Sequence, residues 1–535
     1  MPQSLVRSSR RASPIRRLAA WVAASACDPR TGDRFVAGFV LLHVVLWTVI
    51  LTVLKRGQDI HFDAAEAYAW GQQALLGYGK HPPLSGWVAG VWFRLFPVAD
   101  WASYALAMAV TGFGIWVCWR IALRIVDRRR AVLSVAMLAL YPIFNVKGYK
   151  YNADLLQVAT LPLLVLAYLD AFDKRNVWSG VLLGLAGTTA LMTEYWALTM
   201  IGAIGLAALL HPERLRFLRS PVPWVAIATM LVTMAPHLWW LKQVDFLPLT
   251  YAGDSYETHN RWRSLHSATG YLGHNFALLL LPVLLAALAV RFVPVLAPWR
   301  WRAAHIWANW SRAPSPAVRI PEAIQIWAIQ IIVAFGPPLG GIAFAVLMKT
   351  DWGIPLFFLT PLAIVAMPAL RLPRIAVVQV VVAWLVLTVG FLLLTPRIVS
   401  YNIAHKAQSN PVYQARSELA RELTNIWRMR FGTRWAVVAG PRPTVDLMAF
   451  YSIDHPVPFT PYEKWSSGLM TLAQASRSGY IGICDPTSWD HKLCRDWMKA
   501  NVPDAFHLDI STRRFFSGVP GPVVNWEIYL VAPTP

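Results

Sequence analysis

The chain has 535 residues, of which 56% are hydrophobic and only 14% are charged, and it contains 27 tryptophans. A soluble protein of this length carries much more charge, so the composition excludes an ordinary water-soluble enzyme and favours a polytopic α-helical membrane protein. The net charge of +21 does not predict a nucleic-acid partner, because the basic residues recur in short clusters between apolar runs, as in cytoplasmic loops.

Residues 1–36 are expected to form a basic cytoplasmic tail. The first twenty positions contain five arginines and no acid. The distance from these arginines to the first long apolar run is too great for a cleavable signal peptide. We expect the tail to lie on anionic lipid headgroups.

Apolar runs predict about eleven transmembrane helices within residues 37–395. With the tail inside, the strongly basic loops fall on the cytoplasmic side, and the loops rich in acids and aromatics fall on the periplasmic side. Residues 84–97 are interpreted as a helix lying along the interface. The predicted spans are 37–54, 101–123, 131–146, 154–170, 177–193, 195–210, 221–241, 273–290, 323–348, 354–369 and 375–395.

Three periplasmic loops, 55–100, 145–154 and 243–271, are predicted to carry the chemistry. The first contains HFDAAEAYAWGQQALLGYGKHPPLSGW, in which ionisable residues stand beside membrane spans. Such residues are costly at a membrane and indicate a functional site. On a helix, Asp63 and Glu66 share one face.

These residue types suit transfer of a sugar from a lipid phosphate. A carboxylate, Glu66 or Asp63, can take the proton of an attacking hydroxyl. Basic and amide groups can neutralise and hold the departing phosphate, and aromatic rings can hold the sugar or a lipid tail. The bland alternative for each of them is a solvated loop charge or an interfacial anchor. The candidate donor-binding residues are Lys80, His81, Lys150, Asn152, Arg261, Arg263, Tyr68 and Trp70.

No nucleotide-binding motif is present in the sequence, so the activated substrate is expected to come through the membrane. A divalent metal held by Glu66 with His81 or His237 is left open as a cofactor, although no ligand spacing supports it strongly. His237, near the end of a span, fits a packing histidine better than a ligand.

Residues 396–535 are predicted to form a small soluble periplasmic α/β domain. RWAVVAG is typical of a buried strand and SELARELTNIWRMRF of an amphipathic helix. Cys484 and Cys494 could form a disulfide on the oxidising side of the membrane. Two unrelated thiols remain an alternative, and a zinc pair fits the spacing poorly.

The first loop resembles that of bacterial glycosyltransferase family 39, whose members are polyprenyl-phosphate-sugar-dependent enzymes of the GT-C class. The resemblance lies in AEAYAW at 65–70 and KHPPL at 80–84, with weaker similarity in KYNAD at 150–154. Aminoarabinose, galacturonosyl and protein mannosyl transferases belong to this group. The resemblance implies a GT-C fold with the active site between the first outer loop and the outer ends of the spans.

The chain departs from the family pattern at two positions. Ala65 stands where relatives have Asp before the Glu, so we rank Glu66 first and Asp63 second as the base. Glu194 stands where many relatives have Lys in a Thr-Lys-Tyr sequence. The second departure changes the expected contacts of the donor.

The leading hypothesis is an inner-membrane glycosyltransferase that moves a sugar from a polyprenyl-phosphate donor to a lipid or envelope glycan on the periplasmic face. A protein O-mannosyltransferase acting on Ser or Thr is the first alternative. The second is a non-catalytic binder or flippase of lipid-linked sugars, although transport favours ionisable groups at mid-membrane.

Overall fold

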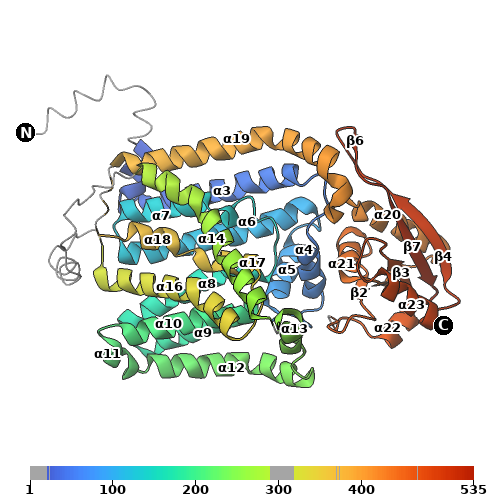
Figure 1. Ribbon diagram of the computed structural model, residues 1–535, viewed down its shortest axis with the longest axis horizontal. Helices are drawn as coiled ribbons and strands as arrows, with labels where there is room; N and C mark the ends of the chain where they lie inside the picture. Colours follow the sequence, from blue (N-terminus) through green and yellow to red (C-terminus); the bar gives the residue numbers. More distant parts are fainter. Residues whose placement is uncertain are drawn as a thin grey trace, which may run out of the picture.

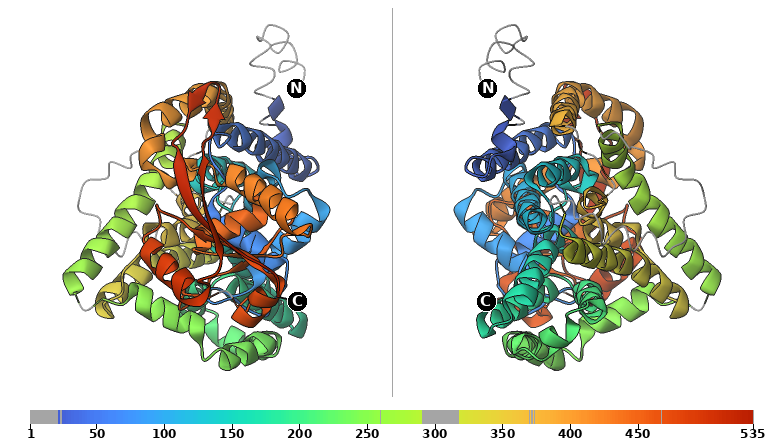
Figure 2. Two further views of the ribbon diagram at one scale, coloured as in Figure 1. Left: turned by 90° about the vertical axis from the view of Figure 1, so that its right-hand side faces the viewer. Right: turned by 90° about the vertical axis from the view of Figure 1, so that its left-hand side faces the viewer.

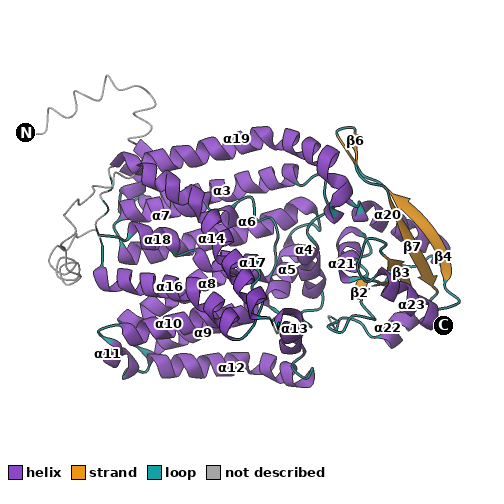
Figure 3. Ribbon diagram, viewed as in Figure 1, coloured by secondary structure: helices purple, strands orange, loops and turns teal. Residues whose placement is uncertain are grey.

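The structure is a computed structural model and describes residues 21, 22, 24–258, 260–289, 318–368, 370, 372, 374–466 and 468–534. A bundle of helices forms the larger part, and a smaller domain containing strands lies at one end of it (Figures 1 and 3). The predicted fold class, a helical membrane protein with a small C-terminal α/β domain, is confirmed. Most of the predicted basic tail, and most of the basic loop after residue 290, lie outside the described residues.

Among the described residues, seven helices are long and apolar enough to cross a membrane. α6 and α8 are mostly buried inside the bundle, whereas α12 and α19 turn apolar side chains such as Val232 and Leu393 outwards. An apolar outer surface is what a lipid environment requires. The seven helices are α3 (Gly32–Leu54), α6 (Asp100–Ile125), α8 (Ala153–Lys174), α12 (Val222–Gln243), α14 (Arg261–Ala289), α16 (Ile320–Ala343) and α19 (Arg374–Lys406).

Shorter helices occupy the remaining predicted spans. α7 is buried in the centre of the bundle, and α9 packs against both α8 and α12. They are α7 (Arg128–Leu140), α9 (Val177–Thr193), α10 (Leu198–Leu210) and α18 (Thr360–Val365), with α11 (Arg214–Leu218) in the connection after α10.

Three predicted boundaries are wrong. Residues 261–271 belong to α14 rather than to a loop, and α19 continues past residue 395 to Lys406. The predicted span 354–369 is broken into a 3₁₀ turn (Ile354–Phe357) and α18, because Pro355 and Pro361 each begin a new helical turn, and the short helix α17 (Thr350–Gly353) precedes it.

Arg130, at the start of α7, stabilises the broken segment. Its guanidinium donates to the carbonyl oxygens of Val365 (2.5 Å), Met367 (3.0 Å) and Leu370 (2.7 Å). These carbonyls belong to the last residue of α18 and to the segment after it, where helical partners are lacking. A basic residue predicted to mark the cytoplasmic side therefore also has a structural role.

The first polar loop forms two helices, α4 (Phe62–Gly71) and α5 (Leu84–Leu95). α5 corresponds to the predicted interfacial helix. The two helices approach closely because a Cβ on Gly71 would lie 2.4 Å from the backbone nitrogen of Gly90 and 2.5 Å from the carbonyl oxygen of Gly86. Glycine at this crossing fixes the position of α4, which carries Asp63 and Glu66.

The C-terminal domain contains a five-stranded sheet in the order β2-β1-β3-β7-β4, in which β1 is parallel to β2 and β3 and β7 is antiparallel to its neighbours. The predicted strand and helix are β1 and α20. A disulfide between Cys484 and Cys494 joins β3 to α23. The elements are α20 (Arg416–Phe431), β1 (Val437–Ala439), α21 (Arg442–Tyr451), β2 (Val457–Phe459), α22 (Leu472–Ser478), β3 (Tyr480–Cys484), α23 (His491–Asn501), β4 (Phe506–Thr512), the hairpin β5 (Phe515–Phe516) and β6 (Val519–Pro520), and β7 (Val524–Val531).

Buried polar contacts dock this domain onto the loop that follows α3. Asp59 accepts hydrogen bonds from the backbone N–H of Arg416 (2.8 Å) and from the guanidinium of Arg514 (2.5 Å). Tyr451 accepts from the N–H of Ile60 and donates to Asp100. α21 therefore packs against α4, and the domain lies across the end of the bundle (Figure 2, left).

Candidate active site

Polar side chains gather at the end of the bundle that faces the C-terminal domain. α4, the connection between α7 and α8, and the tip between α9 and α10 all reach this end, and α13 (Leu247–Tyr256) lies beside them (Figure 1). The first two predicted catalytic loops and the α13 part of the third therefore meet in one place.

Asp63 lies at the start of α4 and is held by two side chains from the connection before α8. Its carboxylate is 3.2 Å from the ammonium of Lys150 and accepts a hydrogen bond of 3.2 Å from the Asn152 amide. The same amide nitrogen donates to Asp154 (3.3 Å), while the side-chain oxygen Oδ1 of Asn152 accepts from the N–H of Leu155 and caps α8. Three residues predicted separately for base and donor binding are therefore in direct contact.

The electric field at this contact keeps both partners charged. Burial alone raises the pKa of Asp63, but the ammonium of Lys150 and the imidazole of His61 bring it below its usual range. Burial lowers the pKa of Lys150, and Asp63 more than offsets this and raises it. At neutral pH the pair is therefore a carboxylate next to an ammonium.

Glu66, one turn further along α4, has a partner from the other domain. It is almost fully buried and forms an ion pair with Arg442, the first residue of α21. The backbone N–H of Arg442 also donates to Glu463 (3.3 Å). Asp446 lies one turn into α21, and its pKa is raised well above the usual range, first by burial and then by Glu66.

Lys80 lies beside this second group on the loop between α4 and α5. Gly79 lets this loop lie close to the backbone of the C-terminal domain, because a Cβ there would lie 2.4 Å from the carbonyl oxygen of Ser466 and 2.8 Å from that of Trp465. The Lys80 ammonium stands 5.4 Å from the ring centre of Tyr251 on α13. Burial lowers the pKa of Lys80, and Glu66 is the acid that most opposes this shift.

The proposed metal ligands are not brought together. Glu66 pairs with Arg442, and His81 lies 2.7 Å from Glu194. His237 contacts the Tyr195 hydroxyl (3.0 Å) and the Leu76 carbonyl oxygen (2.7 Å). Within the described ranges, no group of three or more His, Cys, Asp or Glu side chains could hold a metal ion. The packing interpretation of His237 fits these contacts.

The four other predicted donor contacts lie away from the charged groups. Tyr68 is buried against Phe93 and Phe450, and Trp70 is buried and stacks on Tyr78. Both rings are buried by packing around α4, α5 and α21, so neither has an exposed face that could contact a sugar. Arg261 and Arg263 are exposed on the first turn of α14.

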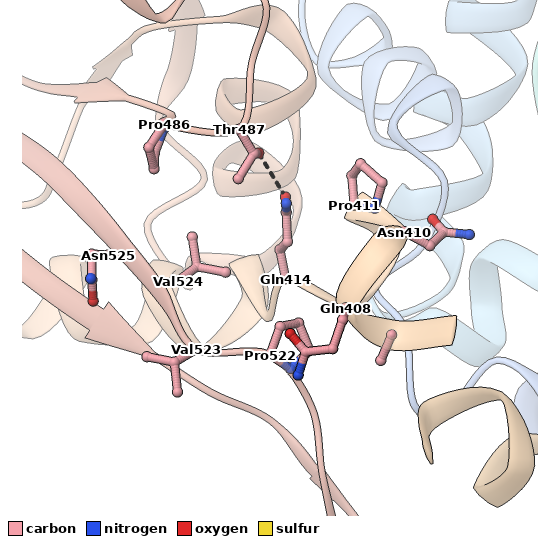
Figure 4. Close-up of a pocket in the computed structure, with 11 residues that line it drawn as sticks. Gln408, Asn410, Pro411, Gln414, Pro486, Thr487, Pro522, Val523, Val524 and Asn525 are labelled. Carbon is pink, nitrogen blue, oxygen red and sulfur yellow. Dashed lines mark hydrogen bonds between the residues drawn. The ribbon is translucent and has the colours of Figure 1, made fainter. Parts of the chain in front are cut away.

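Two cavities lie beyond these charges. One of about 460 Å³ lies where the chain after α19 meets β7; its lining has amides and prolines but no ionisable side chain, and the Thr487 hydroxyl donates to Gln414 across it (Figure 4). The other, of about 240 Å³, lies between α5, α9 and α12, is mainly apolar and reaches His237. Neither is lined by Asp63, Glu66 or a lysine.

Several residues of the site were missed by sequence reasoning. Arg442, Asp446 and Glu463 belong to the C-terminal domain and lie far along the chain from Glu66. The only local signal for Arg442 is its position between two prolines in a Gly-Pro-Arg-Pro turn. That pattern predicts a turn and not a contact with another domain.

Residues 80–240 match the family model described as dolichyl-phosphate-mannose-protein mannosyltransferase. This segment resembles a glycosyltransferase family 39 domain. The matched segment begins at Lys80 and includes Lys150, Asn152 and Glu194, whereas Asp63 and Glu66 precede it and Arg442 follows it.

The chain is similar to lipid A galacturonosyltransferase RgtD of Rhizobium johnstonii, a curated relative that is 26% identical over 238 residues, or 42% of this chain. The match spans 46% of that relative, so the chain covers about half its length.

Among solved structures, ArnT from Cupriavidus metallidurans in the apo state is similar over 93% of this chain and 99% of its own, with a TM-score of 0.56 and 14% identity. ArnT bound to undecaprenyl phosphate gives a TM-score of 0.54 at the same coverage and identity. This likeness establishes the GT-C fold across both parts of the chain.

Proposed function

We propose that the protein is a glycosyltransferase of the bacterial inner membrane. It moves a sugar from a polyprenyl-phosphate-linked donor to a lipid or glycan of the cell envelope on the periplasmic face. The observation that carries the proposal is the contact of Asp63 with Lys150 and Asn152 at the end of the bundle. A relative named for lipid A and a related fold with bound undecaprenyl phosphate support the substrate classes.

Asp63 is the proposed general base, ahead of Glu66. It is partly open to solvent and points at polar groups of the membrane domain, whereas Glu66 is buried against a guanidinium. The acceptor hydroxyl attacks the anomeric carbon, the bond from that carbon to the phosphate oxygen breaks, and Asp63 takes the hydroxyl proton.

Lys80 and Lys150 are the proposed partners of the departing polyprenyl phosphate. A phosphate gains most from cations that are held in place before the charge develops. A phosphate that shares Lys150 also weakens the hold of that ammonium on Asp63. The basicity of the carboxylate then rises when the acceptor needs it.

Charges at the other end of the bundle support the proposed orientation. Arg124 pairs with Asp170 (2.6 Å), Arg175 pairs with Glu213, and Arg128 pairs with Asp33 (2.8 Å). Arginine-rich loops prefer the cytoplasm. The N-terminus is accordingly cytoplasmic, and the site and the C-terminal domain are periplasmic.

Mass spectrometry of lipid A, core and other envelope lipids, from cells with and without the gene, tests the proposal. We expect one hexose, uronic acid or amino-pentose to disappear in the deletion strain. Complementation with Asp63→Asn should not restore it. Asp173→Asn, which removes an acid paired with Arg124 at the opposite end, is the matched control and should restore it. Full restoration by Asp63→Asn would refute the assignment of the base.

A protein acceptor is the second candidate, favoured by the description of the matching family model. Glycoproteomics of envelope proteins from the same two strains separates the candidates. Loss of a hexose from Ser or Thr, with unchanged envelope lipids, would establish the protein acceptor.

A further inference from the structure

The ion pair between Glu66 and Arg442 joins the two domains at the proposed donor site. Glu66 comes from α4 and Arg442 from α21, and both side chains are largely buried, with exposed fractions of 6% and 18%. A buried charge is stable only with a partner. The C-terminal domain therefore supplies the counter-ion that Glu66 requires.

Lys80 lies within the field of the same carboxylate but does not pair with it. Of the acids that act on Lys80, Glu66 has the largest effect, ahead of Glu463 and Asp446. In the part of the chain that the structure describes, Lys80 has no ion pair, and its recorded contact is with the Tyr251 ring.

We propose that Arg442 is a positioning residue that holds the Glu66 carboxylate and thereby keeps the Lys80 ammonium free for the donor phosphate. The proposal rests on the proposed function for the identity of the anion. It gives the C-terminal domain a part in donor binding, because that domain carries the guanidinium.

The physical reason is competition between cations for one buried carboxylate. A guanidinium binds a carboxylate with a fixed, well-matched geometry. When the guanidinium is absent, Lys80, which already lies within the field of Glu66, can form an ion pair with it and compensate the buried charge. The ammonium would then be withdrawn from a phosphate, and its neutral form would become rarer.

Lysine labelling tests this competition without any substrate. Reductive methylation of the full-length protein in detergent, followed by mass spectrometry, gives the rate at Lys80, with Lys174 at the opposite end as internal reference. We expect Arg442→Met to slow labelling of Lys80 about tenfold relative to Lys174, as for a pKa increase of one unit. Arg442→Lys should label close to the wild-type rate, because an ammonium can still pair with Glu66.

The decisive variant is the double substitution Glu66→Gln/Arg442→Met. It removes both charges, so the carboxylate with the largest effect on Lys80 is gone while Glu463 and Asp446 stay as in the wild type, and labelling should return close to the wild-type rate. Continued slow labelling in the double variant would show that Lys80 is not captured by Glu66 and would overturn the proposal. An unchanged Lys80 rate in Arg442→Met would also overturn the proposal.

Binding of undecaprenyl phosphate alone provides the second measurement. Arg442→Met should weaken its affinity about tenfold through the loss of one charge-assisted contact, and the double variant should recover it. If the wild type does not bind undecaprenyl phosphate, the proposed function fails, while the labelling result still decides the role of Arg442. Equal affinity in wild type and Arg442→Met would refute the role in donor binding.

Discussion

Asp63 and Glu66 occupy the same face of α4, but their partners come from different parts of the molecule. Lys150 and Asn152, which hold Asp63, lie in the membrane domain. Arg442, which holds Glu66, belongs to the C-terminal domain. The membrane domain therefore forms the contacts of Asp63 alone, whereas the ion pair of Glu66 requires both domains.

This difference assigns different roles to two carboxylates that look equivalent in sequence. Asp63 keeps contact with solvent and with groups that can face a substrate. Glu66 is withdrawn into the interface, where its charge balances a guanidinium. The role of each carboxylate is therefore better predicted by the domain that supplies its cationic partner than by its position on α4.

The largest expected effect is the loss of the cation beside Asp63. Lys150→Met should lower kcat/KM for sugar transfer about 100- to 1000-fold, because a positioned charge that stabilises the departing phosphate is removed. Lys174→Met, which removes an exposed lysine paired with Asp170, is the matched control. An activity loss of less than threefold in Lys150→Met would mean that Lys150 only fastens Asp63 in place.

Breaking the docking contact should separate the two carboxylates. Asp59→Asn removes one of the two carboxylates paired with the buried Arg514, the other being Glu418, and should lower the free energy of unfolding of the C-terminal domain by about 3 kcal/mol. We expect protease sensitivity in this domain and slower labelling of Lys80, with the Asp63–Lys150 contact retained. If the domain remains as stable as in the wild type, the docking role of Asp59 is wrong.

Removing the disulfide should have a smaller effect, confined to the C-terminal domain. The Cys484→Ser/Cys494→Ser variant opens a short loop between β3 and α23, at a cost of about 2 kcal/mol. Chemical denaturation followed by tryptophan fluorescence should show an earlier transition for this domain. An identical effect on the wild type after reduction would link the loss to the disulfide and not to the new side chains.

The smallest effect concerns the pair of His81 and Glu194. Burial lowers the pKa of His81, but Glu194 outweighs it, so the pKa is raised above its usual value. The stabilisation of the folded protein by this ion pair is therefore fully present below about pH 6.5, the pKa of histidine in the unfolded chain. It is lost as the pH rises through the raised pKa of His81 in the folded protein. Melting temperatures of wild type and His81→Gln should differ by a few degrees at pH 5.5 and converge at high pH. A constant difference across this range would contradict the assignment.

The sequence predicted much of the membrane domain because its signals are local. Apolar runs located the long helices, and the spacing of Asp63 and Glu66 located the polar face of α4. Pro355 and Pro361 break the predicted span 354–369, and hydropathy alone does not reveal this break. The charge pattern did not reveal that α14 begins at Arg261, because a helix can leave the membrane without changing its backbone.

The site was predicted as a set of residues but not as an arrangement. Lys150 and Asn152 were identified through their loop. Tyr68 and Trp70 were predicted to bind a sugar. In the structure Tyr68 is buried against α21 and Trp70 stacks on Tyr78. Arg442 lies 376 positions from Glu66, and no periodic pattern connects residues at that distance.

That separation has a consequence for biosynthesis. At about 5 to 20 residues per second, a ribosome takes roughly 20 to 75 seconds to make the chain between Glu66 and Arg442. During this interval α4 is already inserted while Glu66 lacks its guanidinium partner. Under the proposed role of Arg442, the Lys80 side of the donor site is therefore not organised until the last domain has folded onto α4, and a truncated chain should bind the donor phosphate more weakly than the full-length protein.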